Sequence, residues 1–134
     1  MRIVDMPSPD TVEYGSMPRE LTISVRNMQK ATIVDLTGAI DIGNSHGLRT
    51  TLFDTIPGTP LLALNMTEIR YVDSSGIATL LEVVIKAQNS QKEFVLFGLS
   101  PKVYDILKLM KLLKVFKIFD NEQAALGEGA APPG

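Results

Sequence analysis

Residues 65–78 read N-M-T-E-I-R-Y-V-D-S-S-G-I-A and join the two most clearly patterned segments of the chain. Before them, the short and largely apolar run from Leu61 to Met66 is typical of a strand buried on both faces of a sheet. After them, apolar residues recur at helical spacing from Ser75 to Asn89 and predict a helix with one buried side. A strand that leads directly into a helix indicates an α/β fold with parallel strand pairing.

The alternation of strand and helix patterns continues on both sides of this stretch. We expect a hairpin of strands at 21–26 and 31–37, a helix at 44–56, and further strands at 93–98 and 115–119. Between these two strands, Ser100-Pro101 starts a helix whose buried stripe is formed by Val103, Ile106, Leu107 and Met110. A last helix is capped by Asp120 and ended by Gly127. The predicted order is ββαβαβαβα. It indicates one α/β domain with a mixed sheet of four to five strands and about four helices.

Length and composition indicate a single globular domain. The chain has 134 residues, of which 45% are hydrophobic and 21% are charged. We expect the domain to span residues 21–126. Residues 1–20, with three prolines, are expected to form an extended or flexible N-terminal arm, and residues 127–134, rich in Gly, Ala and Pro, a flexible C-terminal tail.

Several classes of function are disfavoured by composition. The chain has no cysteine and one histidine, His46, which excludes disulfides, thiolate chemistry and a cluster of histidine ligands. A net charge of −2 gives no general reason to expect direct nucleic-acid binding. No signal peptide or membrane span is predicted, so we expect a cytoplasmic protein. We also expect that the protein needs no metal and no cofactor.

The candidate site is the run Asp73-Ser74-Ser75-Gly76, which lies at or just before a helix N-terminus. Free backbone N–H groups and the helix dipole favour negative charge there. On these residues alone simple capping is the favoured interpretation, since Asp and Ser are preferred caps and Gly76 can serve only close backbone approach. Two consecutive hydroxyls beside a glycine also fit an accessible serine that can be modified, which would be Ser74.

A second candidate is the run L-T-G-A-I-D at residues 36–41, interpreted as a strand end, a glycine turn and an acid before the helix near Asn44. Taken alone, Asp41 is interpreted as a turn residue or a helix cap. Loops that follow parallel strands gather at one edge of the sheet. We therefore expect the loops that carry Asp41 and Ser74 to be neighbours.

Together these motifs resemble a known family. The D-S-S-G run at 73–76 after a buried strand, the G-x-x-D run at 38–41 and the apolar C-terminal part ending in E-Q-A-A-L at 122–126 look like a STAS domain of the anti-sigma factor antagonist type, over residues 21–126. The resemblance implies a STAS-like fold and a binding module that is not an enzyme. It also places Lys111 where relatives often have glycine.

The resemblance implies that Ser74 is phosphorylated by a serine/threonine kinase that is also the anti-sigma factor. The unmodified protein would bind this kinase and free a sigma factor, and a metal-dependent serine/threonine phosphatase would restore the unmodified form. The partner-binding residues implied are Asp41, Asn44, Asp73, Ser75, Gly76 and Ile77. Asp41 is expected at the surface that faces the partner.

Two alternatives stay open. The chain could be a STAS-type scaffold or an accessory subunit of a signalling complex or of a lipid or anion transporter, in which Ser74 is not modified. It could also be a small enzyme that uses Ser74 with His46 as base, which the absence of a G-x-S-x-G elbow disfavours.

The lysines at 102, 108, 111, 114 and 117 are interpreted as a solvated face. The oligomeric state is left open.

Overall fold

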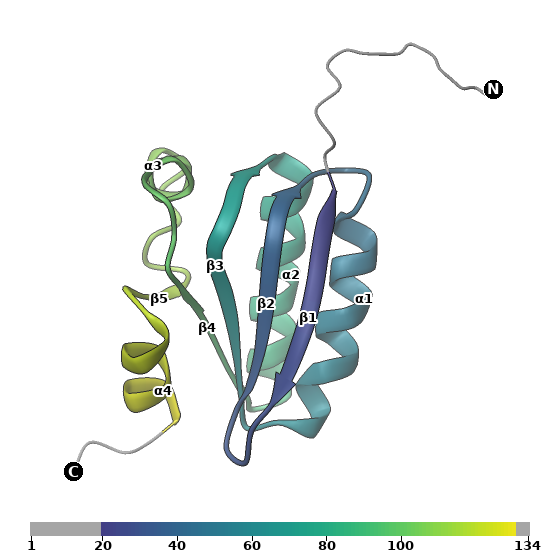
Figure 1. The fold of residues 1–134 in the computed structure, drawn as a ribbon, viewed down its shortest axis with the longest axis vertical. Coiled ribbons are helices and arrows are strands. Elements are labelled where there is room, and N and C mark those ends of the chain that lie inside the picture. The colour runs from purple at the N-terminus through teal and green to yellow at the C-terminus, as the bar shows by residue number, and fades with distance from the viewer. Residues whose placement is uncertain (1–19, 131–134) are drawn as a thin grey trace, which may run out of the picture.

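The computed structural model describes residues 20–130, and the side chains of residues 20–127. Its elements follow the predicted order (Figure 1). They are β1 (Leu21–Asn27), β2 (Thr32–Ile40), α1 (Ser45–Thr55), a short 3-10 helix (Ile56–Gly58), β3 (Leu61–Val72), α2 (Ser74–Asn89), β4 (Glu93–Phe97), α3 (Pro101–Leu109), β5 (Lys117–Phe119) and α4 (Glu122–Ala130).

The five strands form one mixed sheet in the order β1-β2-β3-β4-β5. β1 pairs with β2 in the antiparallel sense, as expected for a hairpin, and every later pair is parallel. Each parallel pair is joined by a connection that contains a helix, because the chain must return to the opposite end of the sheet before the next strand begins. The predicted α/β fold class is confirmed.

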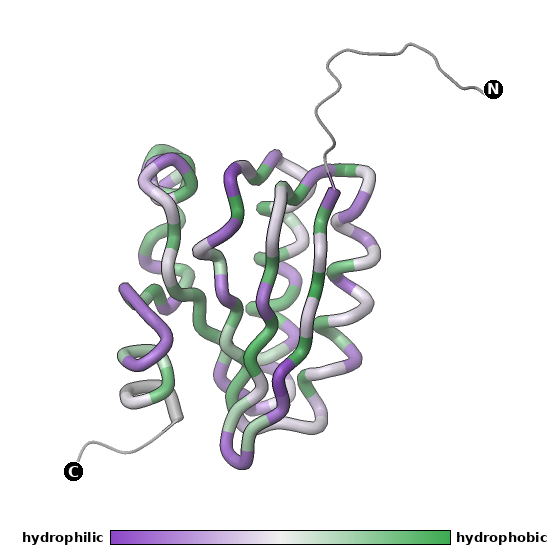
Figure 2. The backbone as a smooth tube through the Cα atoms, viewed as in Figure 1, coloured by the Kyte–Doolittle hydropathy of each residue, from purple (hydrophilic) through white to green (hydrophobic). Residues whose placement is uncertain are grey.

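Different helices bury the two faces of the sheet. Leu36 of β2 belongs to one hydrophobic cluster with Leu52 of α1 and Leu80 of α2, and α3 contributes to the same cluster. On the opposite face, Ile33 packs in a second cluster with Ala125 of α4. Figure 1 shows α1 and α2 behind the sheet, with α3 and α4 toward its β4–β5 side. Figure 2 shows the hydrophobic residues along the central strands and a hydrophilic β1–β2 turn.

Strands β2 and β3 both run further than the sequence predicts. The expected glycine turn at Gly38 is a bulge inside β2, where Gly38 has φ +123° and the pairing register with β3 shifts. A Cβ atom at Gly38 would collide with the backbone carbonyl of Glu20, so glycine is required there. β3 continues past Met66 because Ile40 of β2 still pairs with Val72. The two strands therefore end together, beside the candidate site.

The C-terminal helix also differs from expectation. Its cap is Asn121, whose Oδ1 accepts a hydrogen bond of 2.9 Å from the Ala124 N–H, and not Asp120. The helix does not stop at Gly127 but continues to Ala130, so the first residues of the expected flexible tail are helical. Glycine lowers helix propensity but removes no backbone hydrogen bond, which explains why Gly127 does not end the helix. Residues 131–134 of the predicted tail and 1–19 of the predicted arm lie outside the described residues.

Candidate functional site

The two candidate loops meet at the end of β2 and β3. The Asp73 N–H donates to the Ile40 carbonyl over 3.0 Å, and the Ile42 N–H donates to the Asp73 carboxylate oxygen Oδ2 over 3.2 Å. The expectation that these loops are neighbours is confirmed. Asp73 is thus a side-chain link between the β2–α1 loop and the start of α2.

Asp73 is also the cap of α2. Its Oδ1 accepts hydrogen bonds from the Gly76 N–H (3.0 Å) and from the Ser75 hydroxyl (2.6 Å). The hydroxyl of Ser75, together with the backbone N–H groups of Gly76, Ile42 and Ser75, lowers the pKa of Asp73 from its usual value and outweighs the opposing effect of burial. The carboxylate is therefore ionised at neutral pH, and a fixed negative charge lies at this helix end.

The two consecutive serines have different environments. The Ser75 side chain is half-buried and is engaged by Asp73. Ser74, the first residue of the 16-residue helix α2, is exposed, and within residues 20–127 its hydroxyl makes no hydrogen bond. The sequence left both Asp73 and Ser74 as candidate caps of this helix. Because Asp73 is the cap, the Ser74 hydroxyl is not needed as a hydrogen-bond acceptor for the first N–H groups of α2.

Asp41 is buried in the turn that precedes α1. Asp41 is only 6% exposed, and its place at the surface that faces a partner stays a prediction. Its Oδ1 accepts a hydrogen bond of 2.9 Å from the Gly43 N–H, and its backbone carbonyl accepts from Asn44 and Ser45. These bonds close the turn before α1, and the carboxylate is buried because it serves that turn.

The Asn44 side chain locks the same turn. Its Oδ1 accepts a hydrogen bond of 3.0 Å from the Asp41 N–H, and its amide donates to the Ala39 carbonyl over 2.9 Å. The exposed side chain of the loop is instead Ile42, at 82%. Ile42 is not among the site residues that the sequence motifs indicated. A usable signal was its place in the polar turn D-I-G-N, where an apolar side chain has no route to the core.

Gly76 and Ile77, both implied as partner-binding residues, are buried under the start of α2. A Cβ atom added to Gly76 would lie 2.7 Å from Val72 Cγ1 and 2.8 Å from Ile40 Cγ2, which is closer than packed atoms approach. Ile77 is 2% exposed and belongs to the main hydrophobic cluster. Ile77 therefore packs in the core, and a contact of this residue with a partner stays a prediction. Gly76 allows α2 to approach Ile40 and Val72 closely, as expected if the glycine serves close backbone packing.

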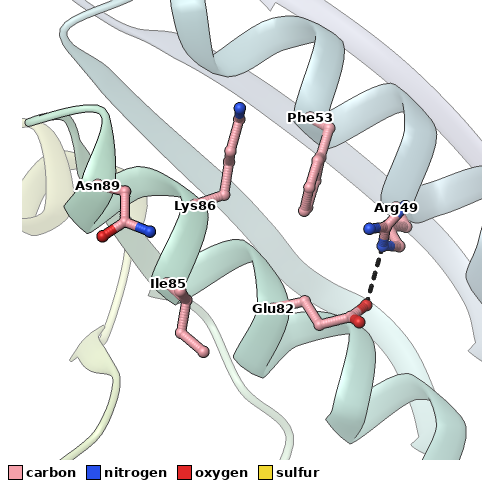
Figure 3. Close-up of a pocket in the computed structure, with 6 residues that line it drawn as sticks. All are labelled: Arg49, Phe53, Glu82, Ile85, Lys86 and Asn89. Carbon is pink, nitrogen blue, oxygen red and sulfur yellow. Dashed lines mark hydrogen bonds and ion pairs between the residues drawn. The ribbon is translucent and has the colours of Figure 1, made fainter.

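A hollow of about 270 Å³ lies between α1 and α2, and several of the residues that line it contact one another (Figure 3). Arg49 of α1 donates to Glu82 of α2 over 2.9 Å, and its guanidinium lies 4.3 Å from the centre of the Phe53 ring. His46 is exposed on α1. Among the described residues, no group of three or more acidic or histidine side chains could hold a metal ion.

The fold and the site together define a single α/β domain in which a capped helix start, linked to the preceding loop, presents an exposed serine. The chain belongs to the STAS domain family, whose family model matches residues 22–125. The family resemblance that the sequence motifs suggested is thereby confirmed.

Solved structures with a similar fold include two anti-sigma factor antagonists and a sulfate transporter family protein. An anti-sigma factor antagonist from Mycobacterium paratuberculosis has a TM-score of 0.78 and 19% identity, over 85% of this chain and 97% of that one. The Bacillus cell fate determinant SpoIIAA in its phosphorylated form has a TM-score of 0.62 and 16% identity, over 78% and 96%. A sulfate transporter family protein from Wolinella succinogenes has a TM-score of 0.66 and 22% identity, over 74% and 84%.

Proposed function

We propose that this protein is an anti-sigma factor antagonist controlled by phosphorylation of Ser74. In the unphosphorylated form it sequesters an anti-sigma factor that is also a serine/threonine kinase, and so frees a sigma factor in the bacterial cytoplasm. A metal-dependent serine/threonine phosphatase reverses the modification. The protein acts as a binding module, with no cofactor of its own and no direct contact with nucleic acid.

The observation that carries this proposal is the difference between the two serines. Ser74 is exposed with a free hydroxyl among the described residues, whereas Ser75 donates its hydroxyl to Asp73. A kinase must withdraw its acceptor hydroxyl from any internal hydrogen bond, and Ser74 has none to break with residues 20–127. The similarity in fold to SpoIIAA, a protein with a phosphorylated form, supports control by phosphorylation.

The unmodified surface offers a partner an apolar contact beside the serine. Ile42 is 82% exposed, and its loop is held against the start of α2 by the bond from its N–H to Asp73. A large apolar side chain on a rigid turn is well suited to fill a partner pocket, because little conformational entropy remains to be lost on binding. Ile42 and Ser74 would form the centre of the partner contact, and Asp73 would fix their positions relative to each other.

Phosphorylation would change this surface by charge and hydration. A phosphoryl group adds about −1.5 to −2 charges at neutral pH. Within the domain, the positive end of the helix dipole at the start of α2 would tolerate it. A partner that buries Ser74 would have to strip water from the phosphate beside the ionised Asp73. A loss of about 2.7 kcal/mol in binding free energy would weaken the complex roughly a hundredfold.

The partner can be identified by affinity capture from the native cytoplasm. The wild-type and Ser74→Ala proteins are expected to retain the kinase, and Ser74→Asp is expected to bind it about a hundredfold more weakly. Gln88→Glu is the matched control, since it adds one negative charge to the same helix about 21 Å away. It should bind like the wild type.

Mass spectrometry after incubation with the captured kinase and ATP then tests the acceptor. We expect phosphate on Ser74 in the wild type and in Ser75→Ala, and none in Ser74→Ala. Phosphate on Ser75 alone, or on no residue, would contradict the assignment.

A second function is favoured by the similarity to the sulfate transporter family protein. In that case the chain would be an accessory subunit of an anion transporter, and Ser74 would stay unmodified. The capture experiment separates the two functions. A transporter subunit retained equally by the wild type and by Ser74→Asp would support this second function.

A further inference from the structure

Residues 106–119, which span the end of α3, the following loop and β5, differ from the rest of the chain. They read I-L-K-L-M-K-L-L-K-V-F-K-I-F, with a lysine at every third position and no acidic residue. Only part of the apolar content is buried. Leu107 and Phe116 lie in the core, whereas Leu109 is 84% exposed and Met110 is 47% exposed. Met110 follows α3 and lies outside the buried stripe to which its spacing had assigned it.

Three of the four lysines in this segment form no ion pair with the described residues. Lys108, Lys111 and Lys114 are exposed, form no ion pair within residues 20–127, and line a hollow of about 220 Å³ together with Leu113. Lys117 differs, since its ammonium pairs with Glu93 at 2.6 Å. We call Lys108, Leu109, Met110, Lys111, Leu113 and Lys114 the lysine–leucine patch.

We propose that the lysine–leucine patch docks the domain on the surface of an anionic phospholipid bilayer. The three free ammonium groups would contact lipid phosphates, and Leu109 with Met110 would enter the boundary between headgroups and acyl chains. No helix among residues 20–130 is long and apolar enough to cross a membrane, so the contact would be peripheral.

The shape of the patch favours a lipid surface over a protein or a nucleic acid. Leu109 protrudes at the end of α3 instead of lining a groove. A fluid bilayer accommodates a protruding side chain without a preformed pocket, whereas a protein partner would need one. Single-stranded nucleic acid is bound by stacking on aromatic side chains, and the patch contains none.

Each contact adds a measurable factor to the binding. One lysine near an anionic surface is expected to strengthen binding about fivefold. Burial of the Leu109 side chain is expected to add about tenfold. Binding by this patch alone would be reversible, since stable anchoring needs more than one such signal. The proposal is independent of Ser74 and of the anti-sigma factor, so its failure leaves the proposed function untouched.

Co-sedimentation of the full chain with vesicles tests the proposal. We expect binding to vesicles that contain phosphatidylglycerol, none to vesicles of phosphatidylcholine alone, and a loss of binding as salt is raised. Lys108→Gln and Lys114→Gln should each weaken binding about fivefold, and Leu109→Ser about tenfold. The matched controls are Lys30→Gln in the β1–β2 turn and Ile85→Ser, an exposed apolar residue of α2.

Absence of binding to the anionic vesicles, equal binding to the neutral ones, or equal losses in the control variants would overturn the proposal. Capture of an acidic protein through the patch by a chain that does not bind vesicles would also overturn it. Thermal melts of all variants are expected to match the wild type, because every substituted side chain is exposed.

Discussion

At the residue scale, Asp73 connects the most parts of the site. One carboxylate oxygen caps α2 and holds Ser75, and the other holds the Ile42 loop. The sequence predicted a cap at this position but offered three candidate residues for it. The geometry assigns the cap to Asp73 and leaves the hydroxyl of Ser74 without a structural role in the described part of the chain.

Asp73→Ala is therefore expected to lower the free energy of unfolding by about 1–2 kcal/mol through the lost cap. Urea denaturation measures the change. Asp54→Ala removes an exposed carboxylate from α1 and serves as the control, with little expected effect. Equal stability of Asp73→Ala and wild type would show that the cap contributes nothing.

Lys111 is strained by its backbone conformation. It follows α3 with φ +62°, in the left-handed region that glycine adopts freely. The family resemblance indicated glycine at this position in many relatives. Lys111→Gly is expected to raise the free energy of unfolding by roughly 0.5–1 kcal/mol, since relief of the strain exceeds the extra entropy of glycine in the unfolded chain.

Gln91, which has φ +58° after α2, provides an independent comparison. Gln91→Gly should give a gain of similar size in the same denaturation experiment. A loss of stability in both variants would refute the explanation by backbone strain.

At the scale of elements, the start of α2 is set by its contact with the ends of β2 and β3. Gly76 lies so close to Ile40 and Val72 that no Cβ fits without movement. This contact fixes where the first turn of α2, and with it Ser74, lies relative to the β2–α1 loop. The D-S-S-G run thus combines an exposed serine with a glycine that the packing requires.

Gly76→Ala is expected to lower the free energy of unfolding by about 1–3 kcal/mol, because the helix must move away from the sheet. Gly47→Ala in α1 is the matched control, since a Cβ there meets no atom within 4 Å. It should stabilise the protein by about 0.5–1 kcal/mol through higher helix propensity. Chemical denaturation of both variants checks the two signs, and a stabilising Gly76→Ala would contradict the packing argument.

At the scale of the whole molecule, charged contacts link segments from both ends of the domain. Arg26 of β1 donates to Asp35 of β2 over 2.6 Å and to Glu122 of α4 over 2.8 Å. The guanidinium, with a smaller contribution from Asn65, holds the pKa of Asp35 below its usual value. The pKa of Asp73 is lowered as well, through its own hydrogen bonds. Both carboxylates therefore stabilise the fold in their ionised forms.

Acid is expected to destabilise the protein for this reason. A carboxyl group whose pKa is lower in the folded than in the unfolded state stabilises the fold above its unfolded pKa, near 3.9, and this stabilisation is lost as the pH falls through the folded pKa. The free energy of unfolding should decrease between about pH 5 and pH 2. Asp35→Asn and Asp73→Asn should each flatten this decrease in denaturation curves recorded across that range. An unchanged pH dependence in both variants would exclude these two groups as its source.

The sequence alone determined the order of the elements, the mixed sheet and the position of D-S-S-G at a helix start. These features follow from periodicity, caps and turn residues, which act over a few neighbouring positions. Sequence patterns did not place Gly38 in a bulge, because its backbone conformation depends on pairing of β2 with β1 and β3.

The tertiary structure alone decided which side chains of the site are exposed. In the fold, Asp41 and Ile77 are buried and Ile42 is exposed. Ser74 is exposed as well, whereas Ser75 is half-buried and hydrogen-bonded to Asp73. Exposure depends on which distant segments pack together, and the bond between Ile42 and Asp73 joins residues that are 31 positions apart. Local patterns carry no information on such a contact, so the residues of the site could be nominated from the sequence while their roles required the fold.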